Sequence, residues 1–380
     1  MSAQIEIQII AIIVAVACSI PGVFLVLRKM AMMSDAITHT ILLGIVLGFF
    51  VVKNLDSPLL IIGATLVGLL TVYLVELLGK TKLVSEDSAI GIVFPLLFSV
   101  AIILISRYAG NVHLDTDSVL LGELAFAPFN RLKIFGVDIG AKAIYTMGVI
   151  LILNIGLMVV FFKEIKIAIF DEQLAAVLGF SPVIIQYGIM TSVSITTVGA
   201  FEAVGSILVI AFMIGPPISA YLMTDSLKRM IGISAFIGAF NAVIGYQFAA
   251  LFDVSIAGMM ATVTGATFFV ILIIAPQRGI ISVLIRRKKQ RIDFAKKSML
   301  FHILHHEGKP NESIENGVET IYHHLNYSKD FLQKIIDIVR NEGILIEENN
   351  VFKLTQMGKK YTINSYEEIV QSFNAEYEGE

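Results

Sequence analysis

The sequence predicts an all-α polytopic membrane bundle, followed by a small soluble α+β domain. Two observations lead to this prediction. Of 380 residues, 56% are hydrophobic and only 16% are charged, whereas soluble domains carry about 25% charged residues. The charge is also uneven, because residues 290–380 contain 10 Lys and Arg and 15 Asp and Glu, a net charge of −5. We therefore predict a transmembrane domain over residues 1–285 and a separate domain over residues 286–380.

Nine apolar runs are long enough to cross a bilayer, so about eight or nine transmembrane helices are expected. A spanning helix needs about 20 apolar residues, and it satisfies its own backbone hydrogen bonds. The count changes if the nearly continuous run 183–224 is divided differently or if the semi-apolar stretch 119–129 enters the membrane. The predicted spans are 7–27, 33–52, 58–78, 88–106, 142–162, 183–201, 203–224, 230–250 and 257–275.

Basic residues predict the orientation of these spans. Lys and Arg concentrate in the cytoplasmic loops of membrane proteins, and five of them lie within positions 286–291, directly after the last span. The C-terminal domain is therefore predicted to be cytoplasmic. Arg28 and Lys29 fall on the same side, and nine spans place the N-terminus outside.

Three local features bear on packing. Cys18 is the only cysteine, so an intrachain disulfide and a cysteine metal cage are both excluded. Gly44 and Gly48 form a G-x-x-x-G pattern, which predicts close packing between helices. Pro216 and Pro217 lack two backbone donors, and we expect them to interrupt their helix.

The strongest candidate site is the pair Asp35 and His39. Ionisable residues inside a membrane are costly and mark functional sites. These two are four residues apart, so on a helix their side chains lie on one face. A carboxylate with an imidazole suits Mn²⁺, Fe²⁺ or Zn²⁺, and two ligands form the weak site that a conduit requires. The alternative is that Asp35 caps a helix and His39 bonds a neighbour. Glu202, between two spans, either lines the path or faces extracellular water.

A short helix is expected between two spans at residues 171–179. It has an acidic first turn and ends at a glycine, and an ordinary loop helix at the membrane surface is the alternative. Its candidate functional residues are Asp171, Glu172, Leu174, Ala175, Leu178 and Gly179.

The sequence contains no phosphate-binding loop of the form G-x-x-x-x-G-K-[ST]. The segment Gly79-Lys80-Thr81 fails because position 74 is Leu rather than the first glycine. The chain is therefore predicted to be a non-enzymatic subunit, and any ATP hydrolysis must come from another chain.

Several segments occur in an order that resembles the ABC-3 group of metal-ion permeases, which import manganese, zinc or iron into bacteria. The resemblance extends from residue 21 to about residue 279. It is carried by GVFLVLRKM at 22–30, SDAITH at 34–39, EDSAIGIVF at 86–94, the segment 171–179, VGSILV at 204–209 and GPP at 215–217.

This resemblance implies a multi-pass protein of the bacterial inner membrane that acts with several partners. These are a second permease chain, identical or paired, two cytoplasmic ATPase subunits and an extracytoplasmic metal-binding protein. It further implies that Asp35 and His39 face the translocation path and that residues 171–179 form the coupling helix on the ATPase. The metal is cargo, and no permanently bound cofactor is expected.

The pattern after the last span resembles a winged-helix domain of metal-responsive repressors. Helices are expected at 292–307, 314–326 and 328–343, then a hairpin around Asn349-Asn350, and a last helix after the L-T-x-x-G segment 354–358. DNA binding is disfavoured, because phosphate contacts need clustered Lys and Arg. The tail is acidic, and the third helix carries only Lys329, Lys334 and Arg340.

Histidines concentrate in this tail. His302, His305 and His306 share one helix face by their i, i+3, i+4 spacing, and His323 and His324 lie on the next predicted helix. Imidazoles in this pattern predict a cytosolic metal-sensing site. The alternative is that they are exposed polar positions on amphipathic helices.

Four functions are compatible with these observations. ATP-driven import of Mn²⁺, Zn²⁺ or Fe²⁺ is favoured, with Asp35 and His39 as transient ligands. An ABC permease for a metal chelate shares the architecture, but a chelate brings its own ligands. A membrane-anchored metal-responsive regulator would use the tail as effector. An ion-coupled carrier would need neither the segment 171–179 nor an ATPase.

Overall fold

The computed structural model describes residues 2–53, 57–108, 124–134 and 137–377. The chain divides into two compact units, Met1–Ile280 and Ile281–Glu380. The domain boundary predicted at residue 285 lies inside one continuous helix, α13 (Ile280–His306). The helix marks no break at that residue, so the boundary stays a prediction.

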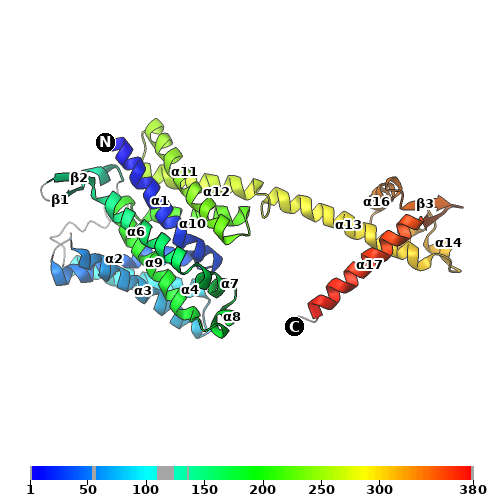
Figure 1. Ribbon diagram of the computed structural model, residues 1–380, viewed down its shortest axis with the longest axis horizontal. Coiled ribbons are helices and arrows are strands. Elements are labelled where there is room, and N and C mark those ends of the chain that lie inside the picture. Colours follow the sequence, from blue (N-terminus) through cyan, green and yellow to red (C-terminus); the bar gives the residue numbers. More distant parts are fainter. Residues whose placement is uncertain (1, 54–56, 109–123, 135–136, 378–380) are drawn as a thin grey trace. The chain divides into compact units, whose positions relative to one another are not determined.

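The first unit is a helical bundle, drawn from blue to yellow-green in Figure 1. Within the described residues, nine helices are long and apolar enough to cross a membrane, and each matches a predicted span to within a few residues at its ends. Of the semi-apolar stretch 119–129, residues 119–123 lie outside the described residues, and Leu124–Phe129 form a 3₁₀ helix, η1. The nine are α1 (Ala3–Leu27), α2 (Ala31–Val52), α3 (Pro58–Lys80), α4 (Glu86–Tyr108), α6 (Lys142–Val160), α9 (Pro182–Val204), α10 (Ser206–Met223), α11 (Leu227–Phe252) and α12 (Ile256–Ile274).

Helix α1 forms the centre of this bundle. It contacts α6, α9, α10 and α11, and it has the largest buried share of the nine spans within the described residues. A helix that is apolar all round is suited to such a position. Small residues let its neighbours approach, since Ala11, Ala15 and Ala17 are fully buried.

Glycines bring α2 and α3 into backbone contact. A Cβ added to Gly44 would lie 2.4 Å from the carbonyl oxygen of Gly63, and one added to Gly63 would lie 2.7 Å from the carbonyl oxygen of Gly44. Gly48 lies against the backbone of Leu60. The predicted role of the Gly44 and Gly48 pattern in close helix packing is confirmed.

The expectation that Pro216 and Pro217 interrupt their helix is wrong. Helix α10 continues through both prolines, and the chain turns instead at Gly205, whose φ of 78° separates α9 from α10. Proline at 217 leaves the carbonyl of Met213 without its helical donor. Gly22 of α1 approaches this carbonyl so closely that an added Cβ would lie 2.0 Å from its oxygen. Contact with a neighbouring helix is how proline is tolerated in membrane helices.

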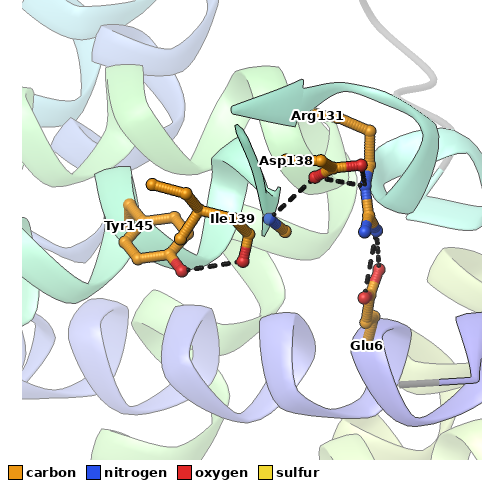
Figure 2. A network of polar contacts seen from close by, with 6 residues as sticks. Glu6, Arg131, Asp138, Ile139 and Tyr145 are labelled. Atoms are coloured by element: carbon orange, nitrogen blue, oxygen red, sulfur yellow. Dashed lines mark hydrogen bonds and ion pairs between the residues drawn. The ribbon is translucent and has the colours of Figure 1, made fainter. Parts of the chain in front are cut away.

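A two-stranded hairpin is fixed to the start of α1, as Figure 2 shows. Strands β1 (Arg131–Ile134) and β2 (Val137–Ala141) pair antiparallel. Nη1 of Arg131 donates to both carboxylate oxygens of Glu6 at 3.0 and 2.8 Å, and Nε donates to Asp138. The hydroxyl of Tyr145 donates to the carbonyl of Ile139 at 3.0 Å. The Glu6 carboxylate is buried, but both of its oxygens accept from one guanidinium nitrogen, and this charge pairing offsets its desolvation.

The second unit has its own hydrophobic core and a small two-stranded sheet. Ile303, Ile321, Leu332, Ile335 and Phe352 are among its buried side chains. Its elements after α13 are α14 (Glu312–Glu315), α15 (Ile321–His324), α16 (Lys329–Asn341), β3 (Leu345–Glu348), β4 (Val351–Leu354) and α17 (Gln356–Tyr377).

The predicted helix 314–326 is wrong in its middle. Two helices of four residues, α14 and α15, are separated by a stretch whose backbone pairs with β4. The amide of Phe352 donates to the carbonyl of Asn316 at 2.9 Å, and Gly317 forms a bridge with Val351. The carbonyl of Asn316 that accepts from β4 is not available to an amide one helical turn later, so tertiary pairing overrides the helical pattern.

The predicted hairpin and the L-T-x-x-G turn are both present. Asn349 and Asn350 have φ values of 54° and 62°, as a two-residue hairpin turn requires. The hydroxyl of Thr355 accepts from the amide of Gly358 at 3.0 Å, which caps α17. A Cβ on Gly358 would lie 2.3 Å from the carbonyl oxygen of Ile344, so a glycine is needed there.

Candidate functional site

Asp35 and His39 lie on one face of α2. Nε2 of His39 is 3.3 Å from Oδ1 of Asp35, and their side chains are 28% and 33% exposed, respectively. Helix α2 begins at Ala31 and the N-cap position is Met30. Asp35 is therefore in the second turn of the helix, and the alternative reading of Asp35 as an N-cap is excluded.

Aromatic side chains of α4 border the pair. The ring of His39 lies 5.5 Å from that of Phe94 and 5.9 Å from that of Phe98, centroid to centroid. Earlier on α2, directly before Asp35, the buried hydroxyl of Ser34 donates to the sulfur of Met213 on α10 at 3.2 Å. Among the described residues, no third His, Cys, Asp or Glu joins Asp35 and His39 in a metal-holding group. One chain therefore offers two candidate ligands beside an apolar wall.

The depth of the pair follows from its place on the helix. Asp35 and His39 are four and eight residues after Ala31, which corresponds to about 6 Å and about 12 Å at 1.5 Å per residue. Both side chains thus lie in the half of α2 that begins near Arg28 and Lys29.

Glu202 is far from this pair. It lies near the end of α9, and its half-exposed carboxylate accepts from Nζ of Lys142 at 3.1 Å. Gln186, which contacts Arg28, is sixteen residues earlier on the same helix, a rise of about 24 Å. Glu202 is therefore at the opposite end of the bundle from Arg28.

The segment 171–179 forms helix α8 (Glu172–Val177) and the turn that follows it, directly after α7 (Phe162–Phe170). Oδ1 of Asp171 accepts from the amide of Leu174 at 2.8 Å, as an N-cap does. Gly179 has a φ of 85°, the left-handed conformation that ends helices. Ala175 is buried, whereas Leu174, Val177 and Leu178 are exposed. The segment thus presents an apolar surface outward.

Arg28 connects α8 to the membrane helices. Its guanidinium donates to Glu172 at 3.1 Å, to the carbonyl of Ala168 at 3.3 Å and to the side chain of Gln186. Gln186 in turn donates to Glu76 of α3. The sequence did not predict this network, because each of its hydrogen bonds joins residues more than a hundred positions apart and no local pattern marks them.

The tail histidines divide into two sets. His302 and His306 lie with Glu315, their ligand atoms within 4.8 Å of one another, and His324 also contacts Glu315. His305 is exposed and faces Lys309. Burial lowers the pKa of His302 by disfavouring its charged form, although the backbone carbonyl of Glu315 acts in the opposite direction.

Comparison with known proteins identifies the family. Residues 4–275 match the ABC 3 transport family. The manganese transport system membrane protein MntD of Bacillus subtilis is 48% identical over 271 residues, which are 71% of this chain and 92% of MntD. The zinc transport system membrane protein TroD of Treponema pallidum is 40% identical over 353 residues, which are 93% of this chain and 96% of TroD. The chain therefore belongs to the ABC 3 transport family.

A solved structure has the same architecture. A chain of PsaBC from Streptococcus pneumoniae, in complex with Fab, is similar with a TM-score of 0.61 and 29% identity, covering 73% of this chain and 94% of that chain. The match to TroD extends into the tail, since it covers 93% of this chain, whereas the matches to MntD and PsaBC leave more than a quarter of this chain unmatched.

Proposed function

We propose that the chain is the membrane-spanning permease subunit of an ATP-driven importer for divalent transition metal ions. The observation that carries the proposal is the partly exposed Asp35 and His39 pair on α2 in a chain of the ABC 3 transport family. Its relatives are named as manganese and zinc transport membrane proteins. Oxygen and imidazole ligands suit Mn²⁺, Zn²⁺ and Fe²⁺.

The pair acts as a transient site. Two ligands bind an ion weakly, and weak binding allows the ion to dissociate quickly after it has bound. A second permease chain, identical or paired, would bring two further ligands to the same ion if its α2 faces this one. Phe94 and Phe98 then exclude water from one side of the imidazole.

Helix α8 is the docking element for a separate ATPase chain. Its support is the exposed apolar surface of Leu174, Val177 and Leu178, together with the absence of a phosphate-binding loop from the sequence. Arg28 bonds Glu172 at the start of α8 and lies a few residues before α2, the helix that carries Asp35. Through these contacts, a movement of α8 is transmitted to α1 and α9.

The C-terminal unit is proposed to be a cytoplasmic winged-helix domain. The order α13, a bridge at Gly317, α15, α16 and the hairpin β3–β4 supports it, as does the basic cluster at 286–291. Glu202 and the hairpin β1–β2 then face outward, where an extracytoplasmic metal-binding protein delivers the ion.

The test is the metal content of cells. A transport-deficient bacterial strain expresses this chain with its ATPase and binding protein, and mass spectrometry measures cellular manganese, zinc and iron. We expect one metal to rise with wild type, and Asp35→Ala and His39→Ala to abolish the gain at matched membrane levels. Asp330→Ala and His323→Ala, both exposed in the tail, are the controls. Uptake that survives both site variants would show that the pair is not the path. If no metal rises although the complex assembles, a metal chelate becomes the substrate to test.

A further inference from the structure

We propose that the C-terminal unit contains a divalent-metal site of its own, formed by His302 and His306 of α13 and Glu315 of α14, with His324 of α15 as a fourth ligand. The site is separate from the transport pair and lies in a different unit of the chain. Its binding of metal does not depend on the proposed transport function.

The first support is the convergence of ligand atoms. One ligand atom from each of His302, His306 and Glu315 lies within 4.8 Å of the others, the one such group of three among the described residues. His302 and His306 are one helical turn apart, with ring centroids 4.8 Å apart. Each Zn²⁺–ligand bond is about 2.1 Å, so two ligand atoms in a tetrahedral site are about 3.4 Å apart. Small side-chain rotations would therefore close the group around an ion.

The second support is His324, which approaches from a third helix. Its Nδ1 lies 3.1 Å from Oε2 of Glu315, and the same oxygen is 3.7 Å from Nε2 of His302. The rings of His302 and His324 are stacked with centroids 5.8 Å apart. One carboxylate thus lies between imidazoles from two helices, the arrangement from which a His₃Glu site forms.

The third support is a buried ring nitrogen. Nδ1 of His306 is buried and has no hydrogen-bond partner among the described residues. A buried polar atom without a partner costs free energy, and a metal ion bound to this Nδ1 would offset that cost. His305, the next residue back, is exposed and faces Lys309 instead.

The scaffold holds the ligands in place. Asn316 is fully buried, and its side-chain Nδ2 donates to the carbonyl of Ile303 at 3.0 Å, which ties the end of α14 to α13. The buried side chains of Ile303 and Ile321 belong to the core that joins α13 to α15. Ligands on packed elements keep their geometry better than ligands on free loops.

The donor set predicts the metal. Three imidazoles and one carboxylate suit Zn²⁺ better than Mn²⁺, because affinity for nitrogen ligands rises along the divalent series toward zinc and copper. A bound ion would join α13, α14 and α15. Because α14 and α15 have only four residues each, they are the elements that such a link would stabilise most.

The test measures Zn²⁺ and Mn²⁺ binding to the full chain in detergent, by calorimetry and by equilibrium dialysis. Asp35→Ala and His39→Ala are built into every sample, so that the membrane pair does not contribute. We expect one tight Zn²⁺ per chain and weaker Mn²⁺ binding. His306→Ala and the shape-conserving Glu315→Gln should lower Zn²⁺ affinity by at least about tenfold, because even outer-shell partners of metal ligands change affinity about 10–100-fold.

His305→Ala and His323→Ala are the matched controls, and both should bind Zn²⁺ as tightly as the parent. Hydrogen exchange supplies a second readout, with Zn²⁺ slowing exchange at amides 312–325 in the parent but not in Glu315→Gln. The proposal is overturned if the parent binds no Zn²⁺ or if the control variants lose as much affinity as the cluster variants. Neither result bears on metal uptake, so failure of this site is distinguishable from failure of the transport function.

Discussion

Arg28 shows how a single residue can join elements that are distant in the sequence. Its side chain is only 8% exposed, and its three partners come from α7, α8 and α9. A buried guanidinium is costly unless its charge is paired. Nη1 and Nη2 of Arg28 donate to the end of α7, the start of α8 and a polar position of α9, whereas its buried Nε has no hydrogen-bond partner among the described residues. The arrangement fixes α8 relative to the membrane helices.

Replacing Arg28 with Ala should weaken the bundle at this end. Glu172 and Gln186 lose a charge-assisted donor, which typically costs about 1.5–3 kcal/mol. We expect a lower thermal midpoint of the purified chain in detergent. Lys166→Ala is the control, since Lys166 is exposed on α7 and should leave the midpoint unchanged. Equal midpoints for the Arg28 variant and the control would refute the structural role of this network.

The two candidate metal sites differ in how far the sequence reveals them. Asp35 and His39 are four residues apart on one helix, so their contact follows from helical geometry alone. His302 and His306 are predictable for the same reason. Glu315 and His324 are not, because their approach depends on how α14 and α15 fold back onto α13. Of the predicted set His302, His305 and His306, the first and last lie with Glu315 in the structure, whereas His305 faces Lys309.

At the scale of elements, hydropathy predicts the spans, but backbone contacts between helices decide their details. The proline pair at 216 and 217 illustrates this. Their lost donors alone favour a break, yet α10 continues through both prolines, and Gly22 of α1 packs closely against the freed carbonyl of Met213. The break in the predicted helix 314–326 has a similar origin, because pairing with β4 takes up the backbone of Asn316.

Gly22→Ala should disturb the contact between α1 and α10. The added methyl group would lie 2.0 Å from the carbonyl oxygen of Met213, and relieving such a clash costs about 1–3 kcal/mol. We expect a lower thermal midpoint in detergent. Gly232→Ala on α11 is the matched control, because nothing lies within 4 Å of an added Cβ there. A Gly22 variant as stable as this control would contradict the packing argument.

Helix α8 is expected to carry the ATPase contact through its outward side chains. Val177 is 84% exposed, so Val177→Glu should leave the fold intact while placing a charge in an apolar contact. We expect the ATPase to be lost when the variant is affinity-purified, with no change in thermal midpoint. Met357→Glu, an exposed apolar position of the tail, should retain the ATPase. Full retention by the Val177 variant would argue against docking at α8.

At the scale of the whole molecule, charge density predicts the two-part organisation. Sparse charge over residues 1–289 accompanies helices whose outward side chains are apolar, such as Ile152, Val159 and Phe240. The charged tail has a separate small core. Its β3–β4 hairpin was predictable, whereas the break in the predicted helix 314–326 was not, since that break depends on pairing with β4.

The tail should be dispensable for transport itself. MntD matches only 71% of this chain while 92% of MntD is covered, so a relative of this kind lacks most of the tail. A chain ending at Lys289 is expected to insert and to raise cellular metal as the full chain does. Mass spectrometry of cells with matched membrane levels measures this. Loss of uptake would assign the tail an essential part in the transport cycle.

The central claim is that metal crosses the membrane past Asp35 and His39. The most direct measurement is ATP-driven accumulation of radioactive manganese or zinc by proteoliposomes that contain this chain and its ATPase, with the metal-binding protein added. We predict accumulation by wild type, and background levels for Asp35→Ala and His39→Ala although both variants still assemble with the ATPase and hydrolyse ATP. Accumulation at the wild-type rate by either variant would contradict the claim.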